Sequence, residues 1–133
     1  MTGEIVPSAV GDKESLARFI LSSRYIRNSD QTVKPDAFIP SPHPDLSVTR
    51  HLYLSEDEIW RTGQGVADTG MKTLYGRADF HASDARKQLL EIKSDASLNN
   101  PNHAIIIDWP AGKPAQKIIA QQIAANSSYR AKP

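Results

Sequence analysis

The side chains best suited to chemistry are cationic and lie near the ends of short predicted strands in the first half of the chain. They are Arg24, Arg27, Arg50 and His51. A guanidinium recognises a carboxylate or a phosphate through two parallel hydrogen bonds, so one interpretation is an anion pocket, for example for a nucleotide phosphate. The alternative is ordinary ion pairing with nearby acids. These are Asp30, Asp36, Asp45 and the acidic residues of 56–58.

A second candidate is the stretch Asn99-Asn100-Pro101-Asn102-His103. Asn and Pro in close succession build a defined turn through bonds from side chain to backbone. This turn would present His103 at the start of a strand, where an imidazole can act as a general base because its ordinary pKa is near neutral. The alternative is that His103 caps the turn by bonding a backbone carbonyl. The predicted ligand-binding residues are therefore Arg27, Arg50, His51 and His103.

Known catalytic and cofactor motifs are absent from the sequence. Gly112-Lys113 lacks the earlier glycine of a P-loop and is followed by proline, and Gly63-Gln64-Gly65 lacks the third glycine of a dinucleotide loop. The chain has no cysteine, and its four histidines do not have the spacing of a zinc site. We expect no metal and no cofactor.

Composition limits the class of protein. The chain has 133 residues, of which 16 are basic and 15 acidic, for a net charge of +1. This length suits one domain, and the balanced charge argues against a nucleic-acid partner. No apolar run is long enough to span a membrane, and the first residues lack the pattern of a secretory signal. We expect a cytoplasmic protein without a membrane partner.

The elements that must position these residues predict an α+β fold: a mostly antiparallel sheet of short strands, with about three helices packed against one face. Leu16, Phe19 and Ile20 have helical spacing and predict a helix over 12–23. Further helices are expected from about 56 to Gly70 and from 113 onward. Strands are expected at 25–27, 32–33, 46–50, 73–80, 88–93 and 103–109. We expect a flexible lead over 1–11, one domain over 12–127 and a flexible tail over 128–133.

Local signals sharpen four positions. Ser55 and Glu58 have the spacing of a capping box, which starts the second helix. Residues 35–38 predict one turn that points Phe38 inward, and the prolines of 40–44 predict a surface loop. Gly76 predicts a bulge or a close approach of another backbone.

Three segments together resemble a family of small bacterial proteins of uncharacterised activity. They are the KP-x-AF-x-P segment at 34–40, the LSV-x-R segment at 46–50 and the NP-x-HA-x-I segment at 100–106. The resemblance spans about residues 24–120. It implies a single-domain bacterial protein and adds no reaction.

The leading functional hypothesis is a small protein that binds a protein partner or a small anionic ligand across the Pro-rich loop, the Arg50 strand end and the His103 turn. An alternative is an enzyme acting on a phosphate-bearing substrate, such as a nucleotide or an RNA end. In that case Arg27 and Arg50 hold the phosphate, and His103 or His51 moves the proton. A further alternative is a component of a toxin–antitoxin pair.

Overall fold

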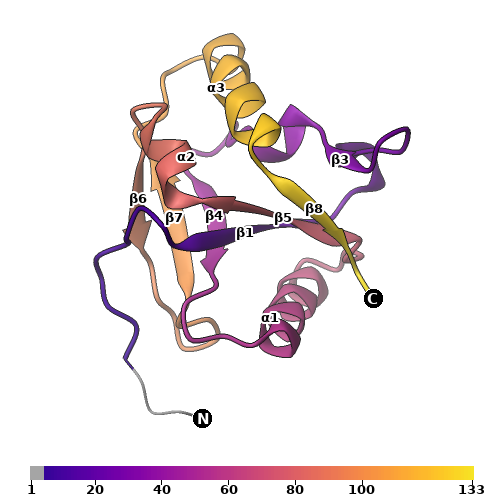
Figure 1. Cartoon of the computed structure of the whole chain (residues 1–133), viewed down its shortest axis with the longest axis vertical. Helices are drawn as coiled ribbons and strands as arrows, with labels where there is room; N and C mark the ends of the chain where they lie inside the picture. Colours follow the sequence, from indigo (N-terminus) through magenta and orange to yellow (C-terminus); the bar gives the residue numbers. More distant parts are fainter. Residues whose placement is uncertain (1–4) are drawn as a thin grey trace.

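The computed structural model describes residues 5–133. Within this range, six strands form one antiparallel sheet in the order β6-β7-β4-β1-β5-β8, and β2 and β3 form a separate pair (Figure 1). The strands are β1 (Ser15–Ile20), β2 (Ile26–Arg27), β3 (Thr32–Val33), β4 (Leu46–Arg50), β5 (Gly76–His81), β6 (Glu91–Ser94), β7 (His103–Ile107) and β8 (Ser128–Ala131). The helices are α1 (Glu56–Thr69), α2 (Ala82–Arg86) and α3 (Lys113–Ala125), with 3-10 turns η1 (Ser23–Tyr25) and η2 (Pro35–Phe38).

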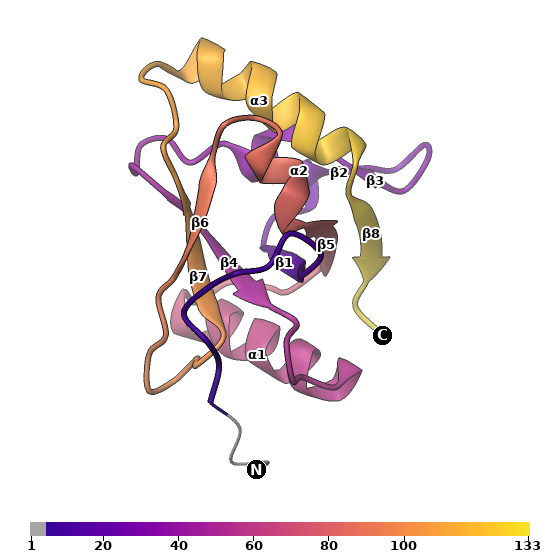
Figure 2. The ribbon, with the colours of Figure 1, turned by 60° about the vertical axis from the view of Figure 1, so that its left-hand side comes forward.

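The predicted α+β class is confirmed, but the helices do not share one face of the sheet. Figures 1 and 2 show α1 on one side and α2 and α3 on the other. Because successive side chains of a strand point to opposite faces, the inner strands bury residues in two separate layers.

The larger layer lies between the sheet and α2, α3 and η2. Its fully buried side chains include Leu16, Phe38, Ile106 and Ile123. Phe38 meets Phe80 edge to face, with ring centroids 5.4 Å apart. The prediction that the 35–38 turn points Phe38 inward is therefore confirmed.

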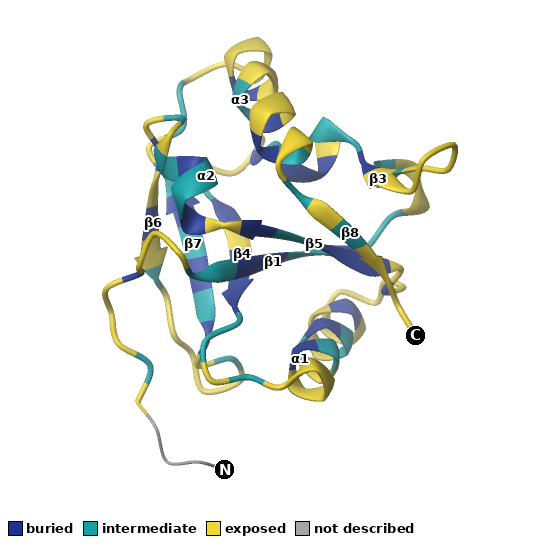
Figure 3. Ribbon diagram, in the orientation of Figure 1, coloured by how far each residue is buried: buried dark blue, intermediate teal, exposed yellow. Residues whose placement is uncertain are grey.

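The smaller layer lies between the sheet and α1. One face of α1 is buried and the other is exposed (Figure 3), because Ile59, Gly63 and Ala67 point inward. A Cβ on Gly63 would lie 2.5 Å from the ring of Phe19, so the absence of a side chain there lets the helix approach β1. On the same layer the Arg77 guanidinium stacks over Trp60, 4.7 Å from the ring centroid.

The predicted helix over 12–23 is wrong, because Ser15–Ile20 form β1 at the inside of the sheet. Both faces of this strand are covered, so it carries buried residues on each side, and Ala17 is as fully buried as Leu16 and Ile20. A strand buried on two faces loses the alternation that would distinguish it from a helix.

Several local predictions are confirmed. Ser55 and Glu58 form the capping box at the start of α1. Gly76 lies where a Cβ would be 2.4 Å from the backbone oxygen of Arg130, so it is a point of close approach.

The expected tail over 128–133 contains a strand, since β8 pairs with β5 along four residue pairs and Tyr129 packs against the core.

The lead expected over 1–11 is only partly covered, because residues 1–4 lie outside the described residues. In the described part of the chain, no helix has the length and apolar character needed to cross a bilayer.

Candidate functional site

The two arginines predicted to bind ligand lie in different environments. Arg27 is exposed on β2 and donates to the Thr32 hydroxyl at 3.2 Å. Arg50 is fully buried, and its guanidinium pairs with both carboxylate oxygens of Glu14, at 2.8 and 2.9 Å. It also donates to the carbonyls of Pro7 and Ala9. Arg50 thus holds the N-terminal segment on the sheet, as the ion-pairing interpretation expects, although with a different acid.

His51 lines a polar cavity of about 220 Å³ beside the start of α1. Its Nε2 lies 3.1 Å from Oδ1 of Asp79. Asp79 also accepts from Nε of the buried Arg77 at 2.9 Å and pairs with Arg130 at 3.2 Å. The Asp79 carboxylate therefore contacts three basic side chains.

The charges in this cavity are largely compensated. Burial raises the pKa of Asp79, but hydrogen bonds from His51 and Arg77 outweigh it and hold the pKa below its usual range. Nη2 of Arg77 donates to Oε1 of Glu56 at 2.8 Å. This network links α1 to the sheet and leaves little free charge for a ligand.

His103 begins β7 after the predicted turn, which is held by side chains as expected. Asn102 donates to the backbone carbonyls of Arg50 and Leu52, and Asn100 accepts from the Asn102 backbone N–H. Nδ1 of His103 lies 3.1 Å from the backbone carbonyl of Asp95. The same nitrogen lies 3.0 Å from Oδ2 of Asp95. The backbone contact is of the kind that the turn-capping alternative expects, although Asp95 lies before the predicted turn at 99–103.

The four predicted residues do not form one site. His103 is directly opposite Thr49 in the β4–β7 register, so it shares a face of the sheet with Thr49. Arg50 is the next residue and faces the other way. The phosphate enzyme hypothesis placed Arg50 and His103 in one pocket, and these positions do not provide it.

A cleft between two strands of the sheet brings apolar side chains and a few polar side chains together. β1 pairs with β5 along its whole length, but it pairs with β4 only at Leu16–Arg50 and Ala17–Thr49. Beyond Ala17 the two strands separate, and the side chain of Arg18 bridges them. Its Nη1 donates to the Ser47 carbonyl at 3.0 Å, and its Nε donates to the Ala37 carbonyl at 2.8 Å.

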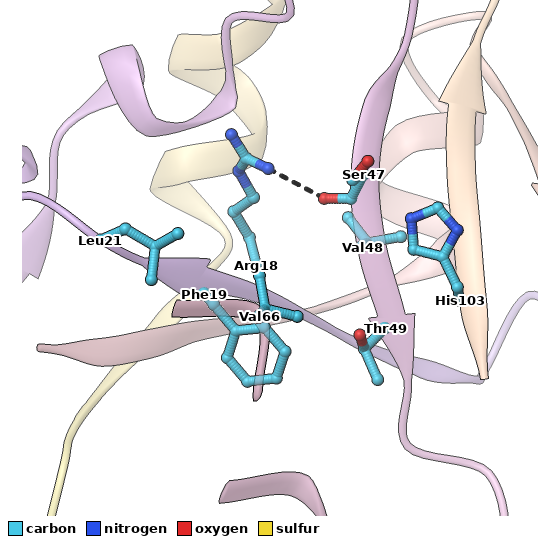
Figure 4. Close-up of a pocket in the computed structure, with 8 residues that line it drawn as sticks. All are labelled: Arg18, Phe19, Leu21, Ser47, Val48, Thr49, Val66 and His103. Atoms are coloured by element: carbon cyan, nitrogen blue, oxygen red, sulfur yellow. Dashed lines mark hydrogen bonds between the residues drawn. The ribbon is translucent and has the colours of Figure 1, made fainter. Parts of the chain in front are cut away.

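The cleft has a volume of about 160 Å³ and a mainly apolar wall (Figure 4). Its lining residues are Arg18, Phe19, Leu21, Ser47, Val48, Thr49, Val66 and His103. They come from β1 and the residue that follows it, from β4, from β7 and from α1, so the fold brings together residues up to 85 positions apart. A small apolar cleft with a few polar groups is the usual form of a small-molecule site.

Arg18 differs electrostatically from the other arginines that are buried or half-buried. Arg50, Arg77 and Arg86 each pair with a carboxylate. Among the described residues no carboxylate lies within ion-pair distance of Arg18, whose protein partners are neutral carbonyls. Burial lowers the pKa of Arg18 to about 10, with Tyr25 partly opposing the shift, so the side chain stays charged at neutral pH.

The sequence analysis singled out His103, which lines this cleft, but it predicted a different set of neighbours and missed Arg18. The error follows from the wrong helix over 12–23, in which Arg18 had no special place. The available signal was a charge between Leu16 and Ile20, at the centre of an apolar segment.

Comparisons with known proteins find no matching family model, curated protein or solved structure. Residues 5–133 contain no group of three or more histidine or acidic side chains placed to hold a metal ion. The geometry of the cleft is therefore the basis for assigning a function.

Proposed function

We propose that this protein binds a small carboxylate with a compact apolar group in the cleft between β1 and β4. The observation that carries the proposal is Arg18, a half-buried cation with no carboxylate partner at the edge of an apolar cleft. A charge removed from water is costly unless it is paired, so an anionic ligand would supply the missing partner.

The cleft also limits the size of the ligand. A cavity of about 150 Å³ accommodates benzene, and the cleft measures about 160 Å³. Phe19, Leu21 and Val66 would surround the ring, and the remaining N–H groups of Arg18 would face the carboxylate. Benzoate is the simplest molecule with both features.

The test is a titration of the whole chain with benzoate and with benzyl alcohol, followed by NMR shifts of backbone amides. Benzoate has nine non-hydrogen atoms, for which a Kd on the order of 1 mM is reasonable. We expect shifts centred on β1 and β4, and at least about tenfold weaker binding of the uncharged alcohol because it cannot pair with Arg18. Equal binding of the two compounds would show that charge recognition is absent.

Two variants locate the ligand. Val66 is 40% exposed on α1, so Val66→Trp can fill the cleft without disturbing the core, and it should abolish benzoate binding. Ile118→Trp is the matched control, because Ile118 is 64% exposed on α3, outside the residues that line the cleft. If Val66→Trp binds benzoate as the control does, the ligand lies elsewhere.

A further inference from the structure

A second cavity, of about 430 Å³, lies where η1, η2, the Pro-rich loop and the start of α3 meet. Its lining residues are Arg24, Tyr25, Lys34, Asp36, Ile39, Ser41 and Lys113. Arg24 and Lys34 flank the β2–β3 pair, and Lys113 is the first residue of α3. Packing of α3 against η2 brings these distant segments together.

The charge of this cavity is unlike that of the whole chain. Three cations, Arg24, Lys34 and Lys113, face it with one carboxylate, that of Asp36. In the described part of the chain, none of the three cations forms an ion pair. An excess of two positive charges thus gathers in one cavity of a protein whose net charge is +1.

Neighbouring groups add donors to these charges. Tyr25 and Ser41, whose side chains carry hydroxyl groups, also line the cavity. The N-cap of α3 is Gly112, which has no side chain to bond the first backbone N–H groups of this 13-residue helix. Uncapped N–H groups at the start of a helix favour an anion. Pro114 has no N–H, so the donors here are the backbone N–H groups of Lys113 and Ala115.

We propose that this basic pocket binds a phosphate ligand carrying at least two negative charges. Lysines bind phosphate as point charges and arginine binds it as a two-point fork, so three such groups suit more than one phosphate oxygen. The volume exceeds that of the cleft by more than twofold. Inorganic pyrophosphate is the smallest probe with this charge and reach. This site is separate from the carboxylate cleft and does not depend on it.

The test is calorimetric titration of the whole chain with pyrophosphate, at low and moderate ionic strength, with sulfate as the comparison anion. We expect pyrophosphate to bind about tenfold or more tightly than sulfate, and its affinity to fall as salt rises because the contacts are charged. Lys34→Gln and Lys113→Gln should each weaken pyrophosphate binding by roughly three- to tenfold.

Lys117→Gln is the matched control, since Lys117 is exposed one turn along α3 and does not line the pocket. It should bind pyrophosphate as the wild type does. Equal weakening by Lys117→Gln and Lys113→Gln, or sulfate binding as tight as pyrophosphate, would overturn the pocket. If a single-stranded RNA binds through Lys34 and Lys113 at least a hundredfold more tightly than pyrophosphate, the ligand of the pocket is a nucleic acid and the proposal of a small phosphate ligand is wrong. Benzoate binding should be unchanged in Lys34→Gln, which separates this result from that of the cleft.

Discussion

Arginine partners separate structural from functional roles in this protein. Arg50, Arg77 and Arg86 each form ion pairs with carboxylates of the same chain, so these arginines stabilise the fold. Arg18 bonds only neutral carbonyls, and Arg24 faces a cavity with two lysines. Arg18 and Arg24 therefore have no carboxylate partner among the described residues, which is why both proposed sites include one of them.

Arg50 gives a direct test of the structural role. Arg50→Met leaves Glu14 and two backbone carbonyls without their donor, and removing one partner of a buried pair costs about 3–5 kcal/mol. We expect that loss in the free energy of unfolding, measured by urea titration. Arg27→Met, at an exposed arginine, should stay within about 0.5 kcal/mol of wild type. A similar effect of both changes would mean that Arg50 does not anchor the N-terminal segment.

The sequence identified the useful residue types but not their partners. It suggested ion pairing for Arg50 with acids close in sequence or at 56–58, whereas the observed partner, Glu14, is 36 positions away. Partner choice depends on strand order, because β1 lies next to β4 in the sheet. Strand order is a property of the whole chain that no local pattern carries.

Elements defined by local chemistry were predictable. The start of α1 follows from its capping box, and the turn at 35–38 follows from Pro35 and the apolar Phe38. β1 was not predictable in this way, because its two buried faces imitate a helical pattern. Local signals are decisive at element ends and weak within short, fully covered strands.

β7 provides the test at this scale. Ile106 is fully buried in the main core, whereas its neighbour Ile105 points to the other face and is half-buried. Ile106→Ala should cost about 2–5 kcal/mol in the free energy of unfolding, because it removes a buried side chain and leaves a cavity. Ile105→Ala should cost clearly less in the same denaturant titration. Equal losses would contradict the assignment of the two faces.

At the scale of the whole molecule, the two faces of the sheet differ in character. The face under α2 and α3 carries the main apolar core together with the buried Arg50–Glu14 pair. The face under α1 carries an ionic network that includes Arg77, Asp79 and Glu56. The overall α+β class was readable from alternating and helical patterns. The division of helices between two faces was not, because it depends on strand order and on which strands pair.

Carboxylates that pair with arginines on both faces of the sheet make stability depend on pH. Burial raises the pKa of Glu14 and Asp79, but hydrogen bonds from their cationic partners outweigh it, and both pKa values lie below the ordinary values of 4.5 and 3.8. The pKa of Glu91 is lowered by the Ile92 backbone N–H and by Arg86. As pH falls through this range, the unfolded chain therefore binds more protons than the folded chain. We expect the free energy of unfolding to be steady above about pH 5.5 and to fall progressively below pH 4.5.

Asp79→Asn tests whether the network causes that fall. The variant should be less stable than wild type at pH 7, since three basic side chains lose their shared carboxylate. It should also lose less further stability between pH 7 and pH 3.5, because one of the groups that couples folding to protons is gone. Urea titrations across this range measure both effects. Asp108→Asn is the control: Asp108 is exposed, forms no ion pair in the described chain and has a φ of 71° that asparagine tolerates. If Asp79→Asn and Asp108→Asn follow the wild-type pH profile equally, acid unfolding begins outside the layer beneath α1.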